Sequence, residues 1–374
     1  MANDPGLFGP DSVSWRVQRE ATVMLGGARA LLMHSAHPLV VAGARQTGMY
    51  ANQPWRRLER TLRQTYTVVF GTREEALAAS RRIDDVHRGI KGVDPVTGLR
   101  YDARDPGLLL WVHACLVDSF LTFERLTVGR LDDAGRQAFH EESMVSAELL
   151  RLPRERIPPT VPALRAYLDE VMASGILRMT DGARRVADLI GNPPRDVPRR
   201  PLWGLIGFLA FQTLPPPLRR LYGVRGGPGR QVLVRASAVG LRVARPLAPP
   251  RIRYVAPAVM AGWRLEGRYG SLAEAAAHWP PANHLPRLAH RPLAQPNCDI
   301  VISRWRLSDR PGPRTSCCAS TPSWPSASRL WPTSKAARSP TCSARRWPAW
   351  SHSAAGTSAS SGCWRRTLPD TSGC

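Results

Sequence analysis

The amino-acid sequence predicts an all-helical protein. Apolar residues recur at helical spacing over long stretches, and proline or glycine stands at the ends of those stretches. No segment sustains the alternation of apolar and polar residues that marks a half-buried strand, so little sheet is expected. The chain has 374 residues, of which 43% are hydrophobic, which is too long and too apolar for a disordered tail. We expect one multi-helix domain over residues 8–268 and a separate tail over residues 269–374.

The first two predicted helices are bounded by residues that stop helices. Residues 15–35 carry apolar side chains at every third or fourth position, and Pro38 follows them. Residues 55–69 repeat the pattern and end before Gly71. Each stretch therefore has its own predicted end.

A capping motif predicts the start of the third helix. Thr72-Arg-Glu-Glu75 has a threonine followed three residues later by a glutamate, the pattern of a capping box. The helix should run to about Ile90. Pro95 and Gly98 then favour a loop over residues 94–105.

The most apolar predicted helix begins at Pro106 and runs to residue 121, interrupted only by His113, Asp118 and Ser119. A helix that is apolar on nearly all sides is buried. Further helices are expected over residues 132–150, 160–176 and 202–214. The last of these is long enough for a buried or interfacial helix and too short to span a bilayer.

The charge distribution and the composition argue against a nucleic-acid-binding protein and against a protein with a membrane-spanning helix. The net charge is +23, but 50 of the 52 basic residues are arginines scattered among acids, whereas nucleic-acid binders gather basic residues on one face or tail. We therefore expect no nucleic-acid partner. The first residues show neither the basic region nor the apolar region of a targeting signal, and no uninterrupted apolar run reaches the ~18–20 residues of a spanning helix. Cys115, alone in the body of the chain, fits a reducing compartment. A cytoplasmic protein is expected, with contact to a membrane surface left open and the oligomeric state not predicted.

The tail differs in composition from the rest of the chain. From Cys298 onward it is rich in Ser, Pro, Arg, Trp, Cys, Thr and Ala without periodicity, and it holds half of the twelve tryptophans. One hypothesis is a shifted reading frame in a GC-rich gene, which would make the tail aberrant. The other is a natural low-complexity, disordered tail.

Four polar residues share one face of the second predicted helix. Arg57, Arg60, Thr61 and Gln64 stand at positions i, i+3, i+4 and i+7. The chain carries no signature of a serine hydrolase, a zinc protease, a P-loop NTPase or a c-type cytochrome. Such a face is either a solvated basic stripe or a site for a carboxylate-bearing ligand such as a haem with its propionates.

Three histidines favour the second interpretation of that face. His37, His87 and His113 lie on separate apolar segments that flank it. Imidazole ligates iron, and its second nitrogen is fixed by a neighbouring acceptor. The alternative is a helical bundle with buried histidines and no cofactor.

Several short motifs in this region are informative because of their order. They are His37-Pro38 before Arg45-Gln-Thr-Gly-Met-Tyr50, Arg57-x-x-Arg60-Thr61 before Val69-Phe-Gly-Thr72, Val86-His-Arg-Gly-Ile-Lys-Gly92, Gly98-x-x-Tyr101-x-Ala103-x-Asp105-Pro106, Trp111-Val-His-Ala114, and Leu214-Pro215 before Leu218-Arg-Arg-Leu-Tyr-Gly223. Together they resemble the family that groups the ER-bound oxygenase MpaB with the catalytic domain of rubber oxygenase, the latex-clearing protein. The resemblance covers about residues 8–265.

The resemblance implies an all-helical, globin-like domain that holds a non-covalent b-type haem. It implies an oxygenase that uses dioxygen to oxidise or cleave a small apolar substrate, lipid-like or isoprenoid-like, with an electron donor that the sequence does not identify. Two alternatives remain: a haem-binding or gas-binding protein without turnover, and a cofactor-free helical protein that binds lipids or a partner.

The resemblance also implies roles for individual residues near the haem. His87 resembles the axial iron ligand, and His113 resembles a recurrent histidine that either supports the ligand or is the ligand itself. Arg57, Arg60 and Thr61 match the Arg-x-x-Lys-Thr pattern of the family, and all three are expected to contact the haem. Arg60 replaces the lysine, which keeps the charge but changes the geometry.

The expected catalytic residues are His37, Arg57 and Thr61. The rubber oxygenase has a carboxylate on the distal side of its haem, where this chain offers His37 and no acid. His37 is therefore the candidate distal residue, able to hydrogen-bond a ligand or to act as a base near neutral pH. The missing carboxylate puts rubber cleavage in doubt.

Overall fold

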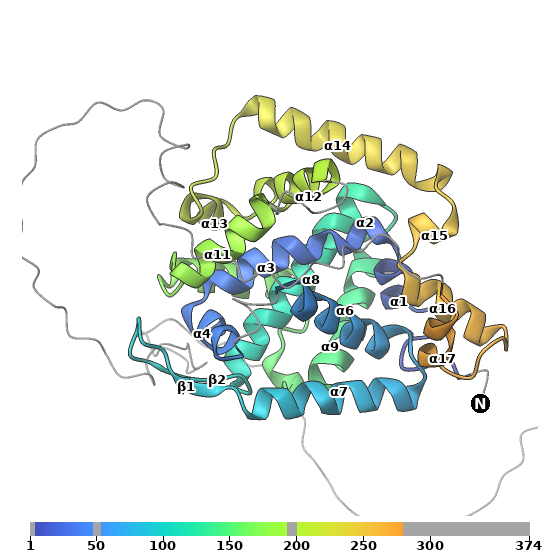
Figure 1. Ribbon diagram of the computed structural model, residues 1–374. Coiled ribbons are helices and arrows are strands. Elements are labelled where there is room, and N and C mark those ends of the chain that lie inside the picture. Colours follow the sequence, from blue (N-terminus) through green and yellow to red (C-terminus); the bar gives the residue numbers. More distant parts are fainter. Residues whose placement is uncertain (1–3, 48–53, 193–199, 280–374) are drawn as a thin grey trace, which may run out of the picture. The chain divides into compact units, whose positions relative to one another are not determined.

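The computed structural model describes residues 4–47, 54–192 and 200–279, and their secondary structure is almost entirely helical (Figure 1). In chain order the helices are α1 Val13–Gln18, α2 Ala21–Met24, α3 Gly26–Ala36, α4 Pro38–Gln46, α6 Pro54–Phe70, α7 Arg73–Arg88, α8 Pro106–Thr127, α9 Asp133–Leu149, the 3-10 helix Arg154–Arg156, α10 Val161–Ala173, α11 Asp181–Gly191, α12 Arg200–Gln212, α13 Pro216–Leu221, α14 Pro228–Leu247, α15 Pro250–Arg253, α16 Ala256–Leu265 and α17 Leu272–Ala277. The all-helical prediction is confirmed. From residue 280 onward, the predicted tail lies outside the described residues.

The helix predicted over residues 15–35 is instead three helices, α1, α2 and α3. One break lies at Leu25, between α2 and α3, and the other at Glu20, whose extended backbone forms a bridge with Tyr254. The buried Glu20 carboxylate accepts hydrogen bonds from Arg245 at 2.7 Å and Arg253 at 3.1 Å. These arginines are 225 and 233 residues further along the chain, so the local apolar pattern does not contain the reason for the break at Glu20.

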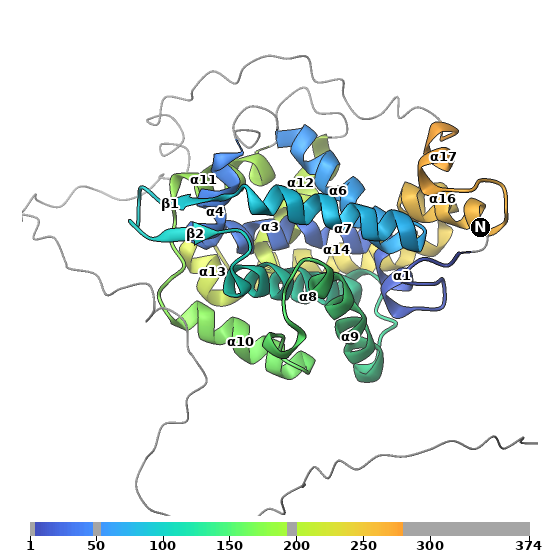
Figure 2. The ribbon, with the colours of Figure 1, turned by 90° about the horizontal axis from the view of Figure 1, so that it is seen from below.

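Helices α6 and α7 follow their predicted bounds closely. The capping box is present: Thr72 Oγ1 accepts from the backbone N–H of Glu75 at 3.1 Å, and Glu75 Oε2 accepts from the backbone N–H of Thr72 at 2.9 Å. The reciprocal hydrogen bonds satisfy donors that the first helical turn leaves free. The two helices pack against each other, and α7 also contacts α9 (Figures 1 and 2).

The loop predicted over residues 94–105 contains a strand, so this part of the prediction is wrong. Strands β1 (Lys91–Val93) and β2 (Arg100–Asp102) form an antiparallel hairpin with Gly92 opposite Tyr101. Asp94 closes the turn, because its carboxylate accepts from the backbone N–H of Thr97 at 3.0 Å and from its hydroxyl at 2.7 Å. Side-chain hydrogen bonds of this kind stabilise tight turns.

Helix α8 is the central helix of the described part of the chain. Asp105 caps its N-terminus, and α2, α3, α9, α10 and α14 pack against it (Figure 2). Among the described residues it is the one helix long and apolar enough to cross a bilayer. Other helices bury 61% of its most apolar window, as they would for the core helix of a globular domain.

The described helices continue past residue 268. Helix α17 packs against α16, and the two share a small apolar cluster with α6 and α1 that includes Trp15 and Phe70. The rings of Trp15 and Phe70 meet edge to face, with centroids 4.9 Å apart. Helices α14 to α17 therefore connect the end of the described chain with its beginning.

Candidate functional site

The C-terminal half of α4 joins three other elements. Arg57 Nη1, on α6, donates a hydrogen bond to the carbonyl of Ala44 at 3.0 Å. Gln46 Nε2 donates to the carbonyl of Gly89, just after α7, at 3.2 Å, and Tyr101 Oη donates to Gln46 Oε1 at 3.3 Å. Helix α4 is thus hydrogen-bonded to the start of α6, the end of α7 and the hairpin.

His87 lies in the last turn of α7, beside this junction. Its Nδ1 atom is buried and has no hydrogen-bond partner among the described residues. Burial lowers the pKa of His87, and the charges of Arg104 and Arg57 lower it further against the opposing effect of Asp84. The ring is therefore neutral at pH 7, which is the form of imidazole that binds metals.

An ion pair one turn earlier fixes this end of α7. Arg104 donates to both carboxylate oxygens of Asp84, from Nε at 2.9 Å and from Nη2 at 2.7 Å, and Arg151 adds a longer contact at 3.4 Å. Burial raises the pKa of Asp84, but the hydrogen bonds and charge of Arg104 outweigh it and hold that pKa below its usual range. Sequence reasoning missed this pair, although Asp84 stands three residues before His87 on the same helical face.

His37 is fully buried at the junction of α3 and α4, and Pro38 is the first residue of α4. Its ring centroid is 6.3 Å from that of Trp111 on α8. Burial lowers the pKa of His37 to about 4, so this ring is also neutral at pH 7.

His113 lies on α8 and faces a different neighbour. Its ring centroid is 6.4 Å from that of His140 on α9, and its Nε2 atom is buried with no partner among the described residues. Residues two apart on a helix point about 200° apart, since each residue turns the helix by 100°. Because Trp111 contacts His37 and His113 contacts His140, His37 and His113 lie on opposite sides of α8.

The four residues of the polar face predicted on α6 differ in how far they are buried. Arg57 and Gln64 are half-buried, whereas Arg60 and Thr61 are exposed. Gln64 Oε1 is buried and, within the described ranges, has no hydrogen-bond partner. Arg57 is the member of the face whose positive charge lowers the pKa of His87.

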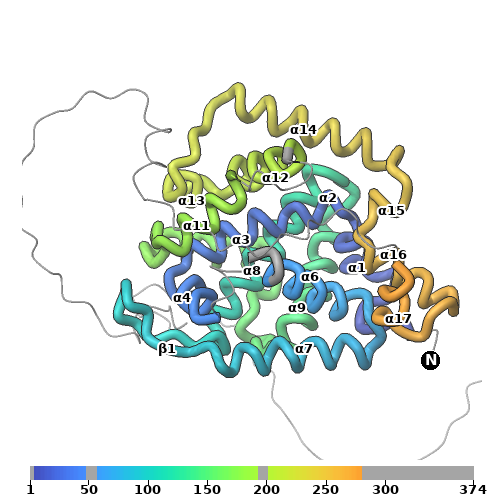
Figure 3. The backbone as a smooth tube through the Cα atoms, viewed as in Figure 1, coloured from blue at the N-terminus to red at the C-terminus, as the bar shows by residue number. Residues whose placement is uncertain are grey.

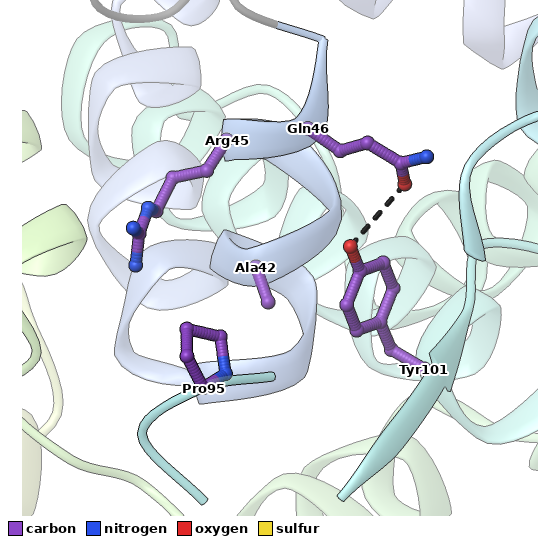
Figure 4. Close-up of a pocket in the computed structure, with 5 residues that line it drawn as sticks. All are labelled: Ala42, Arg45, Gln46, Pro95 and Tyr101. Carbon is purple, nitrogen blue, oxygen red and sulfur yellow. Dashed lines mark hydrogen bonds between the residues drawn. The ribbon is translucent and has the colours of Figure 1, made fainter. Parts of the chain in front are cut away.

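A cavity of about 270 Å³ lies between α4 and the hairpin (Figure 4). Its described lining consists of Ala42, Arg45, Gln46, Pro95 and Tyr101. Gly43 lets the hairpin approach α4 closely, because a Cβ there would lie 3.0 Å from the side chain of Ile90. His87 is not among these lining residues, although Gln46 is bonded to Gly89 two residues after it.

The chemistry of these side chains fits a haem. In the described part of the chain, no three His, Cys, Asp or Glu side chains gather to hold a bare metal ion. A haem needs only one protein ligand of the histidine type, because the porphyrin supplies four nitrogens. His87 has a buried ring nitrogen without a described partner, and Arg57 offers a guanidinium that pairs well with carboxylates.

The neutral histidines make stability depend on pH. His34 Nε2 donates to the carbonyl of Val112 at 3.0 Å, and burial lowers the pKa of His34 to about 4. Between pH 6.5 and 4 the unfolded chain binds a proton at this residue and the folded chain does not, so the free energy of unfolding falls as the pH falls. We expect this residue to account for about 2 kcal/mol between pH 7 and pH 5.

Urea unfolding at pH 7 and pH 5 measures this dependence. In His34→Gln the free energy of unfolding should fall less between pH 7 and pH 5 than it does in the wild type. The same change at the exposed His278 is the matched control and should leave that fall unchanged. An equal fall in the free energy of unfolding for the His34 variant and the wild type would contradict the prediction.

Comparison with known proteins gives a family and two relatives. The family model described as ER-bound oxygenase mpaB/B'/Rubber oxygenase, catalytic domain, matches residues 15–243. Two uncharacterized proteins, Rv2237 of Mycobacterium tuberculosis and Mb2261 of Mycobacterium bovis, are each 28% identical over 150 residues. These matches cover 38% of this chain and 58% of each relative, little more than half of the relative's length. No solved structure matches the chain.

The match agrees with the resemblance of the short motifs, and it spans all of the predicted site residues from His37 to His113. It also covers more than half of the chain. The chain therefore belongs to the mpaB and rubber oxygenase catalytic-domain family.

Proposed function

We propose that this protein is a haem b-dependent oxygenase that uses dioxygen to oxidise or cleave an apolar, lipid-like or isoprenoid-like substrate. Membership of an oxygenase family supports the reaction class. The observation that carries the cofactor is the neutral ring of His87, which keeps a buried Nδ1 atom without a described hydrogen-bond partner.

In this proposal His87 holds the iron, and Arg57, Arg60 and Thr61 hold the polar edge of the haem. When bound, haem would supply a redox-active iron that activates dioxygen. Arg57 remains protonated at any physiological pH and would neutralise a propionate. Its hydrogen bond to Ala44 ties this charge to α4, the helix that His37 immediately precedes.

His37 would serve as the distal residue. It lies on the side of α8 opposite His113, so only one of these two histidines can face a given haem pocket. Its low pKa keeps the imidazole neutral, with one N–H to donate and one nitrogen to accept a proton. Full burial at this junction also excludes water from the ring.

The test begins with the visible spectrum of the purified full-length protein after incubation with haemin. A Soret band that co-elutes with the protein, followed by oxygen-dependent oxidation of an alkene such as squalene with a chemical reductant, is the expected result. Free haem at the same concentration is the control for uncatalysed oxidation.

Two other results would contradict the proposal in different ways. A haem complex that forms no product above the free-haem control would indicate a haem-binding or gas-binding protein without turnover. A preparation that stays colourless would indicate a cofactor-free helical protein.

A further inference from the structure

Helix α14 leaves one apolar face uncovered. It runs along the outside of α12 and α8, which both contact it (Figures 1 and 3). Val232, Val239, Val243 and Leu247 are between 57% and 81% exposed. Their spacing of 7, 4 and 4 residues places them in one line along the helix. Exposed apolar stripes of this length mark interaction surfaces.

The opposite face of α14 attaches the helix to the protein through polar contacts and small residues. Ala238 and Arg245 are buried, and Arg245 pairs with Glu20 at 2.7 Å. Arg242 donates from Nε to the carbonyl of Leu126, at the end of α8, at 2.9 Å. The exposed valines take no part in this attachment, so they are available to a partner.

The stretch of chain that contains α14 carries charged side chains of one sign. Although acids are interspersed with arginines along most of the chain, residues 200–265 contain eleven arginines and no lysine, aspartate or glutamate. Arg235 and Arg251 are exposed and have no ion-pair partner among the described residues. Ile252, next to Arg251, is 69% exposed. Arg235 on α14 and Arg251 on α15 thus present positive charge that no described acid neutralises.

We propose that the α14 stripe docks on the surface of a membrane that contains anionic lipids. Valine and leucine side chains would enter the boundary between headgroups and acyl chains, while arginines would pair with lipid phosphates, the arrangement of an interfacial amphipathic helix. A second copy of this chain is a poorer occupant, because pairing two such faces would bring Arg235 and its neighbours against like charges.

This inference does not depend on the proposed function. It rests on the exposure of α14 and on the charge of residues 200–265, and it holds whether or not the protein binds haem. An experiment can therefore refute membrane docking without refuting haem binding, and the reverse.

The experiment is flotation of the full-length protein with vesicles of phosphatidylcholine alone or mixed with phosphatidylglycerol. The wild type should float with the mixed vesicles and remain free with phosphatidylcholine. The double variant Val239→Asp/Val243→Asp should lose binding by about tenfold or more, because each aspartate adds a charge that is costly near lipid and repelled by it.

Val96→Asp is the matched control, since Val96 is 63% exposed on the hairpin, away from α14 (Figure 1). It should bind vesicles within about twofold of the wild type, and circular dichroism should show that both variants fold. Arg235→Gln/Arg251→Gln should release from the vesicles at a lower salt concentration than the wild type.

Four results would overturn the proposal. They are no flotation of the wild type, equal binding to both vesicle types, retained binding by the α14 double variant, and a wild-type dimer that the double variant converts to a monomer without any lipid binding. The last result would assign the stripe to a second copy of the chain.

Discussion

The His87→Ala variant is expected to lose the Soret band that haemin gives with the wild-type protein. The charge of Arg57 lowers the pKa of His87, and the buried Nδ1 atom of His87 has no described hydrogen-bond partner. Changes to residues that merely support a metal ligand already cost about 10–100-fold in affinity, so loss of the ligand should weaken haem binding by roughly 100-fold or more. Haemin titration followed in the Soret region measures the affinity.

Two further variants separate ligation from folding. His113→Ala should retain the band, because His113 faces His140 on the other side of α8 from His37. His87→Gly should regain a band when imidazole is added to the solution, because the small ligand can occupy the space of the lost ring. Loss of the band in His113→Ala and its survival in His87→Ala would transfer the ligand role to His113.

The Arg29→Met variant should show a large loss of stability. Arg29 is buried on α3 and pairs with Asp118 on α8 at 2.7 Å, while its other nitrogens donate to Ser119 Oγ at 2.7 Å and to the Thr213 carbonyl at 3.0 Å. Removing one partner of a buried pair leaves an uncompensated charge, which typically costs about 3–5 kcal/mol. Because small domains are stable by only about 5–15 kcal/mol, we expect urea unfolding at a much lower midpoint.

The exposed pair Arg88–Asp85 supplies the control. Its side chains are more than 60% exposed, so Arg88→Met should change the free energy of unfolding by less than about 1 kcal/mol. The double variant Arg29→Met/Asp118→Leu should recover part of the loss, since it removes the stranded carboxylate. Similar small effects at positions 29 and 88 would show that the buried pair does not stabilise the fold.

The sequence predicts those parts of the fold that local chemistry determines. The start of α7 is an example, because Thr72 and Glu75 form the capping box from within four residues. The break at Glu20 is the opposite case, because its cause is an ion pair with Arg245 and Arg253 at the other end of the described chain. Helices α14 to α16 were not predicted, since proline and arginine interrupt their apolar pattern, and α17, which holds neither residue, lies in the stretch predicted as tail.

For the candidate site, too, the sequence predicts what helical spacing determines and does not predict contacts between distant segments. Helical spacing places Arg57 and Gln64 on one face, and both are half-buried in the structure. The opposite orientations of Trp111 and His113 also follow from their spacing, but which neighbours they meet depends on the packing of α3 and α9. The pair between Asp84 and Arg104 could not be read from periodicity, because it crosses from a helix to a loop.

The ion pairs of Glu20 bear on where the chain can be truncated at its C-terminal side without loss of stability. The family match ends at residue 243, so it includes Glu20 and excludes both Arg245 and Arg253. A protein trimmed to the matched residues would keep a buried carboxylate and lose the two guanidiniums that neutralise it. We therefore expect a stable truncated protein to extend at least through α15, beyond the residues that the family model matches.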